Sequence, residues 1–201
     1  MILIIDHIVI YLILKISISW QITMVTKLES ERKFLVKFPT SWASLSEMFD
    51  DLIDVKRISQ TYLEAEDGEP SARVRKTVEG LTGDTDTVYH YNQKELVEAG
   101  VHKEKEHEIT KSQYEKNLKK CHPKKVEVQK TRFVFKYNDQ IFELDVFKGP
   151  LKGLAILEIE LDDIDDTVEL PPFLKVIKEV TKDKRFTNYA LADKKLHASR
   201  D

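Results

Sequence analysis

Ionised side chains recur two residues apart in several short segments of the 201-residue chain, and most of these pairs carry one sign of charge. The pairs are Glu29 with Glu31, Arg73 with Arg75, Glu104 with Glu106, Lys130 with Arg132, Glu143 with Asp145, and Glu158 with Glu160. In a β-strand, side chains two residues apart lie on the same face. Like charges at such positions repel each other, so a face that only meets water normally mixes the two signs. A solvated face of an antiparallel sheet explains any one pair, but the whole set indicates a shared site.

The two kinds of pair suit two kinds of ligand. Glutamate pairs offer the hard oxygen ligands that Mg²⁺ and Mn²⁺ prefer. Arginines offer planar forks for bidentate contacts with phosphate, and lysines offer compact charges for the same anion. If eight strands closed into a barrel, these groups would face one another across a lumen, at high cost unless they were paired or held water, a cation and a polyanion. The pattern therefore predicts a site for a metal-bound, phosphate-rich anion, which is the setting of phosphoryl transfer.

Strands dominate the expected secondary structure after Met24, because apolar and polar residues mostly alternate there. Eight candidate strands cover residues 27–36, 57–67, 71–79, 86–94, 102–109, 125–137, 140–148 and 154–162. As a set they are rich in Val, Ile, Tyr and Phe, and turn signals separate several of them.

Three or four helices are expected between the strands. The spacing of apolar residues predicts a helix over residues 41–55. Thr110 is expected to cap a second helix, because Gln113 completes a capping box with it. Pro171 and Pro172 predict the start of a third helix that runs through about Val180, and a short fourth helix is expected over residues 189–197.

Composition excludes several classes of protein. The net charge is −3, so bulk attraction to nucleic acid is not expected. The single cysteine, Cys121, excludes a disulfide framework and a cysteine-rich zinc site, and a reducing cytoplasmic setting is the expectation. The sequence has no P-loop, no glycine-rich dinucleotide motif and no HExxH-type histidine pair.

Residues 1–24 form an apolar leader that differs from residues 25–201. Asp6 and Lys15 are its only charged residues, although the chain has 32 basic and 35 acidic residues. Three interpretations stay open. The leader is sequence upstream of a true start at Met24, a weak membrane anchor, or an extra strand or partner-binding segment. Its charges interrupt it before the roughly 20 apolar residues of a bilayer span, so membrane association is not expected unless the leader is real.

Residues 27–195 resemble the CYTH domain superfamily, whose members are also called triphosphate tunnel metalloenzymes. The likeness rests on an ordered set of motifs. These are Glu29-x-Glu31-x-Lys33, Arg73-x-Arg75, Lys94 at the end of a strand, Lys130-Thr131-Arg132-Phe133, Glu143-Leu144-Asp145-Val146-Phe147 and Leu157-Glu158-Ile159-Glu160. A tail of Glu179-Val180-Thr181 with Asp183, Arg185-Phe186 and Asn188 is also similar. Many members carry an arginine where this chain has Gly100-Val101-His102-Lys103, and neither His102 nor Lys103 supplies a bidentate fork.

The resemblance implies an α+β fold: a closed eight-stranded antiparallel β-barrel, with helices packed outside, whose tunnel binds a triphosphate with Mg²⁺ or Mn²⁺. It implies metal-side carboxylates at Glu29, Glu31, Glu158, Glu160 and Asp145, with Glu104 and Glu106 as a supporting acidic cluster. Phosphate contacts would come from Lys33, Arg73, Arg75, Lys94 and Arg132. Lys130 would act in catalysis, near the attacking water or the leaving phosphate.

The activity expected from this resemblance is metal-dependent hydrolysis of a triphosphate. The substrate is inorganic tripolyphosphate, thiamine triphosphate or a nucleoside triphosphate, and the chain is expected to be a monomer or a homodimer. Two alternatives stay open. One is a cyclase of the class IV adenylate cyclase type, and the other is a module that binds triphosphate or polyphosphate without catalysis.

Overall fold

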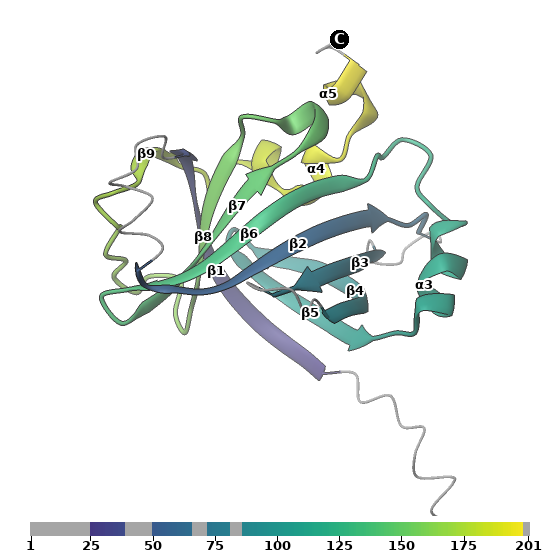
Figure 1. Ribbon diagram of the computed structural model, residues 1–201, viewed down its shortest axis with the longest axis horizontal. Coiled ribbons are helices and arrows are strands. Elements are labelled where there is room, and N and C mark those ends of the chain that lie inside the picture. The colour runs from purple at the N-terminus through teal and green to yellow at the C-terminus, as the bar shows by residue number, and fades with distance from the viewer. Residues whose placement is uncertain (1–24, 39–49, 66–71, 81–85, 199–201) are drawn as a thin grey trace, which may run out of the picture.

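The structure, a computed structural model, describes residues 25–38, 50–65, 72–80 and 86–198. These residues form nine strands and a few short helices (Figure 1). The strands are β1 (Val25–Lys37), β2 (Leu52–Tyr62), β3 (Ala72–Glu79), β4 (Asp86–Glu98), β5 (Val101–Glu108), β6 (Val128–Tyr137), β7 (Gln140–Phe147), β8 (Ala155–Leu161) and β9 (Lys175–Glu179). The helices are α3 (Lys111–Leu118), α4 (Asn188–Leu191) and α5 (Lys194–Ala198), with 3-10 turns η1 (Gly149–Leu151) and η2 (Lys184–Phe186).

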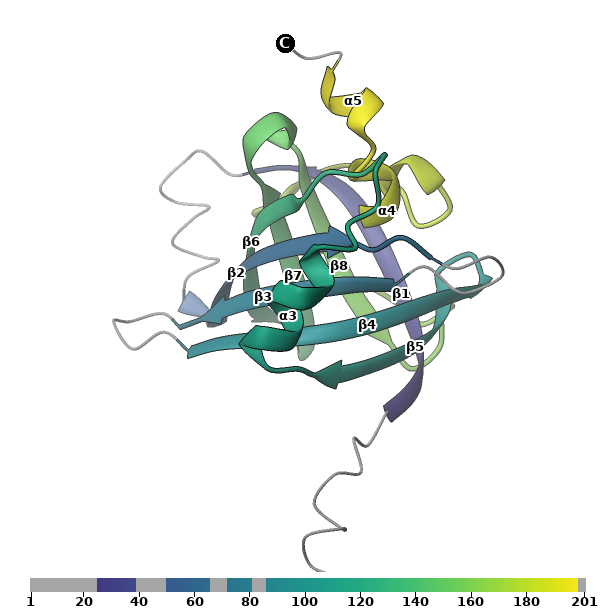
Figure 2. The ribbon, with the colours of Figure 1, turned by 90° about the vertical axis from the view of Figure 1, so that its right-hand side faces the viewer.

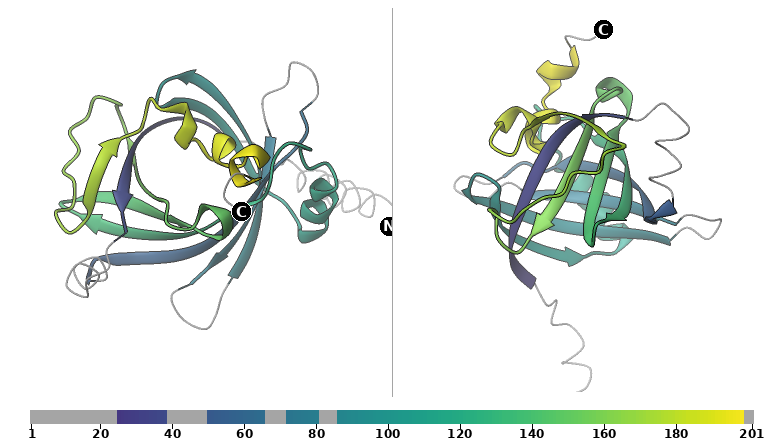
Figure 3. Two further views of the ribbon diagram at one scale, coloured as in Figure 1. Left: turned by 90° about the horizontal axis from the view of Figure 1, so that it is seen from above. Right: turned by 90° about the vertical axis from the view of Figure 1, so that its left-hand side faces the viewer.

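Eight of the strands close into an antiparallel barrel, as the sequence predicts. The order is β5-β4-β3-β2-β6-β7-β8-β1, and pairing of β5 with β1 completes the ring. Figure 3 (left) shows this ring of strands from above. β9 lies outside the ring and pairs with the last four residues of β1, from Phe34 to Lys37.

β1 closes the barrel and pairs with three other strands, β5, β8 and β9. One of its edges pairs with β8 from Ser30 to Val36. Its other edge pairs first with β5, from Val25 to Ser30, and later with β9. Between these two partners, the Glu31 N–H donates to the carbonyl oxygen of Gly100 at 2.8 Å.

The main apolar core lies on the outer face of the barrel wall, because charged residues occupy the inner face. Phe34, Phe135, Leu144 and Leu157 are each no more than 3% exposed and alternate in sequence with the inward residues. The connection after β8 covers them, with Leu174 and partly buried residues such as Phe173 packed against them. Burial of each such side chain contributes about 1.5–3 kcal/mol, so the fold does not need an apolar bore.

Two further apolar clusters position helices against the barrel. Helix α3 packs on the outer face of β3 and β4 through Tyr114, which lies with Val74 and Leu63 (Figure 2). At one end of the bore, Tyr62, Phe147 and other inward apolar residues pack against Leu191 of α4. The predicted placement of helices outside the barrel is therefore confirmed. Helix α4 packs against the apolar residues that fill one end of the bore.

Several predicted elements differ from the structure. The helix predicted over residues 171–180 is wrong: β9 forms there, because hydrogen bonds to the free edge of β1 outweigh the helix-start signal of two prolines. The helix predicted over residues 41–55 overlaps residues 39–49, which lie outside the described residues, and its last residues belong to β2. The expected helix over residues 189–197 is divided into α4 and α5. The capping box between Thr110 and Gln113 is confirmed at the start of α3.

The leader, residues 1–24, also lies outside the described residues, so the three interpretations of it stay open. Within the described ranges, no helix combines the length and the apolar composition that crossing a bilayer requires.

Candidate active site

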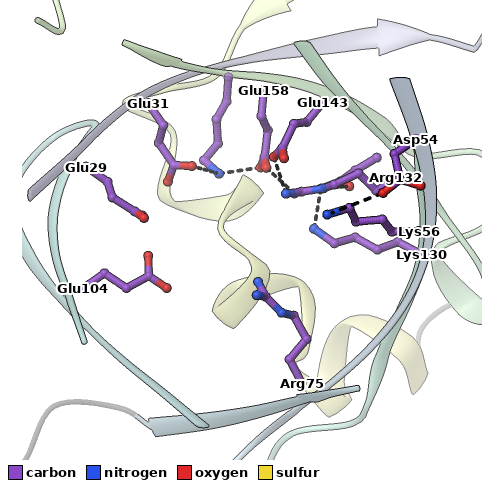
Figure 4. A network of polar contacts seen from close by, with 12 residues as sticks. Glu29, Glu31, Asp54, Lys56, Arg75, Glu104, Lys130, Arg132, Glu143 and Glu158 are labelled. Atoms are coloured by element: carbon purple, nitrogen blue, oxygen red, sulfur yellow. Dashed lines mark hydrogen bonds and ion pairs between the residues drawn. The ribbon is translucent and has the colours of Figure 1, made fainter. Parts of the chain in front are cut away.

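The bore of the barrel is a cavity of about 1010 Å³ that brings together nearly all of the predicted site residues. Figure 4 shows side chains from opposite walls pointing into it. Among the predicted residues, those that line it are Glu29, Glu31, Lys33, Arg73, Arg75, Lys94, Glu104, Glu106, Lys130, Arg132, Glu158 and Glu160. Asp145 is completely buried behind this lining. The geometric expectation that both charge sets share one lumen is met.

One wall of the cavity is a buried ion network on β1, β8, β6 and β7. Glu158 is its centre: it accepts from Lys33 Nζ at 2.5 Å and from Arg132 Nη2 at 2.7 Å. Arg132 also binds Asp145 through two nitrogens, each at 2.7 Å, and contacts Glu143. Burial alone would raise the pKa of Glu158, but Lys33, Lys130 and Arg132 hold it well below its usual value. This carboxylate is therefore ionised at neutral pH.

Lys130 of β6 lies on the same wall, next to Arg132. It is 4% exposed and its ammonium pairs with Asp145. Burial, followed by the charge of Arg132, lowers its pKa from the usual lysine value. An amine held in this way gives up a proton more readily than a surface lysine does.

The opposite wall, on β3, β4 and β5, presents two arginines side by side. Arg73 Nη2 donates to Glu104 at 3.0 Å, and Arg75 Nη2 donates to Glu106 at 2.9 Å. The Nε atoms of both arginines are buried and have no hydrogen-bond partner among the residues that the structure describes. Unpaired buried donors are costly, and an anion with several oxygens would satisfy them. This wall is therefore suited to phosphate.

Two carboxylates face each other between these walls. Figure 4 shows Glu29 of β1 and Glu104 of β5 pointing toward one another. Burial and the hydrogen bond with Glu104 raise the pKa of Glu29 to about 7. Burial opposes ionisation of Glu104 too, but the hydrogen bond from Glu29 and the charge of Arg73 lower its pKa to about 2. Glu29 therefore titrates near neutral pH, even with Lys94 lying 3.4 Å from Glu29 and 3.5 Å from Glu104.

The donor chemistry of this pair fits a hard divalent cation. Mg²⁺ is usually held by one or two carboxylates, with water and phosphate oxygens completing its six positions. Glu29 and Glu104 supply two carboxylates in the cavity, and the charge of Glu160 also raises the pKa of Glu29. Across the described ranges, no three histidine, cysteine or acidic residues are clustered closely enough to hold a metal by themselves. The residues therefore fit a cation that shares its ligands with phosphate and water.

The comparisons with known proteins agree with this geometry. The model of the CYTH domain matches residues 27–187. The chain belongs to the CYTH domain family. The crystal structure of the inorganic triphosphatase NE1496 is similar, with a TM-score of 0.52 and 32% sequence identity, covering 82% of this chain and 97% of that chain. The "Inorganic triphosphatase" of Nitrosomonas europaea is 46% identical over 68 residues, which are 32% of this chain and 44% of the relative. This sequence match therefore spans less than half of that relative's length.

His102 of β5 lines the cavity of this CYTH barrel. His102 Nδ1 is 3.7 Å from Glu31 Oε1. Burial, followed by the nearby charge of Lys94, lowers the pKa of His102 to about 4. The imidazole is therefore neutral at physiological pH, and it supplies neither the charge nor the fork of an arginine.

Several side chains of this CYTH site were not predicted from the sequence. Asn92 is 1% exposed and donates to both Glu104 and Glu106, with the second contact at 3.1 Å. Lys56 lines the cavity and pairs with Glu79 at 3.1 Å. Alternation along β2 could have found Lys56, but the predicted strand began one residue after it. No charge pattern marks Asn92, although it stands on the same face as Lys94.

Proposed function

We propose that this CYTH protein is a divalent-metal-dependent triphosphatase that hydrolyses a triphosphate inside its barrel. The observation that carries the proposal is the pairing of two unlike walls in one cavity. Arg73 and Arg75 present buried Nε donors that lack a partner within the described ranges, and on the other wall Glu158 binds both Lys33 and Arg132. The 32% identity to an inorganic triphosphatase over most of both chains supports the same activity.

Each of the predicted basic residues has a role in this proposal. Arg73 and Arg75 bind the phosphate chain, and Lys33 and Lys94 contribute point charges beside it. Arg132 completes the phosphate contacts when a phosphate oxygen replaces one of its carboxylate partners. Lys130 stands next to Arg132 and takes part in catalysis at the attacking water or the leaving phosphate.

The metal side is assigned to carboxylates. Glu29, Glu31, Glu158 and Glu160 are the proposed ligand set, with Glu104 as the partner that faces Glu29. Asp145 remains in the proposed set as support for this region through its pairs with Lys130 and Arg132. A bound Mg²⁺ or Mn²⁺ would neutralise phosphate charge and polarise the terminal phosphoryl group.

Inorganic tripolyphosphate is the proposed first substrate, because the two relatives named above are each described as an inorganic triphosphatase. The experiment is a phosphate-release assay over tripolyphosphate, thiamine triphosphate and ATP, each with Mg²⁺, with Mn²⁺ and with a chelator. Release from tripolyphosphate that the chelator abolishes is the expected result. Cyclic AMP from ATP would favour a cyclase, and tight binding of tripolyphosphate without release would favour a non-catalytic module.

A further inference from the structure

A short stretch of β1 is held on its outer edge by a side chain instead of a strand. The stretch lies between the residues that pair with β5 and those that pair with β9. The Lys33 N–H donates to Thr181 Oγ1 at 3.0 Å, and the Val180 N–H donates to the Lys33 carbonyl oxygen at 2.7 Å. Residues 180 and 181 therefore replace a strand partner at Lys33.

The Thr181 hydroxyl is itself fixed from the outside of the barrel. It donates to Glu179 Oε1 at 2.7 Å. Arg32 binds the same carboxylate with two nitrogens, Nε at 3.0 Å and Nη2 at 2.8 Å. We call Arg32, Glu179 and Thr181 the outer latch. The latch connects Arg32, which faces outward within the Glu29-x-Glu31-x-Lys33 motif, to the backbone N–H of Lys33.

The inner side of the same stretch carries part of the candidate site. Lys33 Nζ lies 2.5 Å from Glu158 and 3.2 Å from Glu31. Lys33 pairs with Glu158 and Glu31 with Glu160 in the register of β1 with β8. A change in the backbone at Lys33 would therefore move its ammonium relative to both carboxylates.

We propose that Arg32, Glu179 and Thr181 are positioning residues that set the backbone of Lys33, and so the placement of the Lys33 and Glu31 side chains in the cavity. The meaning of that placement for catalysis rests on the proposed triphosphatase function. We expect loss of the latch to shift the backbone of β1 at Lys33 without unfolding the strand, because β8 pairs with β1 along its opposite edge from Ser30 to Val36. A shift of about 1 Å in a positioned group can cost on the order of 100-fold in rate.

The first test compares Thr181→Val with Thr181→Ser. Valine has nearly the shape of threonine but cannot accept from the Lys33 N–H, whereas serine can. We expect Thr181→Val to weaken calorimetric binding of tripolyphosphate about tenfold, the scale of a lost buried hydrogen bond, with Thr181→Ser within twofold of the unmodified protein. Arg185→Gln is the matched control, because Arg185 pairs with Asp183 on the same segment and is 78% exposed. Its binding is expected to be unchanged.

The second test exchanges the charges of the latch. We expect Arg32→Glu and Glu179→Arg each to weaken tripolyphosphate binding, and the double exchange to recover most of the loss. This comparison decides the matter if Thr181→Val does not fold. The inference is overturned if the variants lower the melting temperature but leave binding and the ratio of kcat to KM unchanged, because the latch would then only stabilise the fold.

The two proposals can fail separately. If the protein binds tripolyphosphate and the latch variants weaken that binding, but no phosphate is released, the latch is supported and hydrolysis is refuted. If phosphate is released equally by folded Thr181→Val and the unmodified protein, hydrolysis is supported and the latch is refuted.

Discussion

Binding of a divalent cation in the cavity should compete with a proton on Glu29. Burial and Glu104 raise the pKa of this carboxyl to about 7, so below that pH the cation must displace a proton that it need not displace above it. At pH 5.5 only about 3% of Glu29 is ionised. The affinity for Mn²⁺ should therefore fall on the order of 30-fold between pH 8 and pH 5.5, or about 2 kcal/mol.

The assay is calorimetric titration of the full-length protein with Mn²⁺ at pH 5.5, 6.5, 7.5 and 8, without phosphate. Repeating the titration in buffers of different ionisation enthalpy counts the protons released, and about one proton per cation is expected at pH 6. Glu104→Gln is the matched variant. It removes the charge that faces Glu29, so its Mn²⁺ affinity should be lower at pH 8 but should vary less with pH. Affinity that is constant from pH 5.5 to pH 8 in the unmodified protein would refute the assignment of Glu29 as a ligand of the cation.

Three substitutions test other parts of the site. Glu158→Gln removes the carboxylate shared by two buried cations, so thermal unfolding should show a loss of about 3 kcal/mol and phosphate release should vanish; full activity would contradict its central place. Gly100→Ala puts a methyl group 2.7 Å from Ile164 Cδ1 and 2.9 Å from Thr181 Cγ2 at a φ of +88°, so a melting temperature lowered by the equivalent of about 1–2 kcal/mol is expected, and an unchanged one would show that the turn relaxes. Asn92→Leu removes the donor that two carboxylates of β5 share, and KM for tripolyphosphate should rise about tenfold with little change in kcat; an unchanged KM would show that the arginines hold those carboxylates alone.

The barrel could be predicted from the sequence because apolar and polar residues alternate along most of its strands. Glu158 and Glu160 face inward, while Leu157 and Ile159 are 0% and 2% exposed in the outer core. The same two-residue alternation therefore predicts both the residues of the site and the residues of the core. The capping box at Thr110 was equally predictable, since its two hydrogen bonds join residues only three apart.

The parts that the sequence did not predict depend on contacts between distant residues. β9 follows two prolines, and only the free edge of β1, about 140 residues earlier, makes it a strand. The pKa of Glu29 depends on Glu104, which closure of the barrel brings to it from β5. Asn92 carries no charge, so a search for charge patterns passes over it, although it holds two charged neighbours in place.

The most direct test of the central claim is a crystal structure of the protein with Mn²⁺ and tripolyphosphate, with the metal located by its anomalous scattering. The account predicts a metal peak inside the bore, bound to at least one of the carboxylates Glu29, Glu31, Glu104, Glu158 and Glu160, with phosphate oxygens on Arg73 and Arg75. Metal and phosphate bound only on the outer surface of the barrel would contradict it.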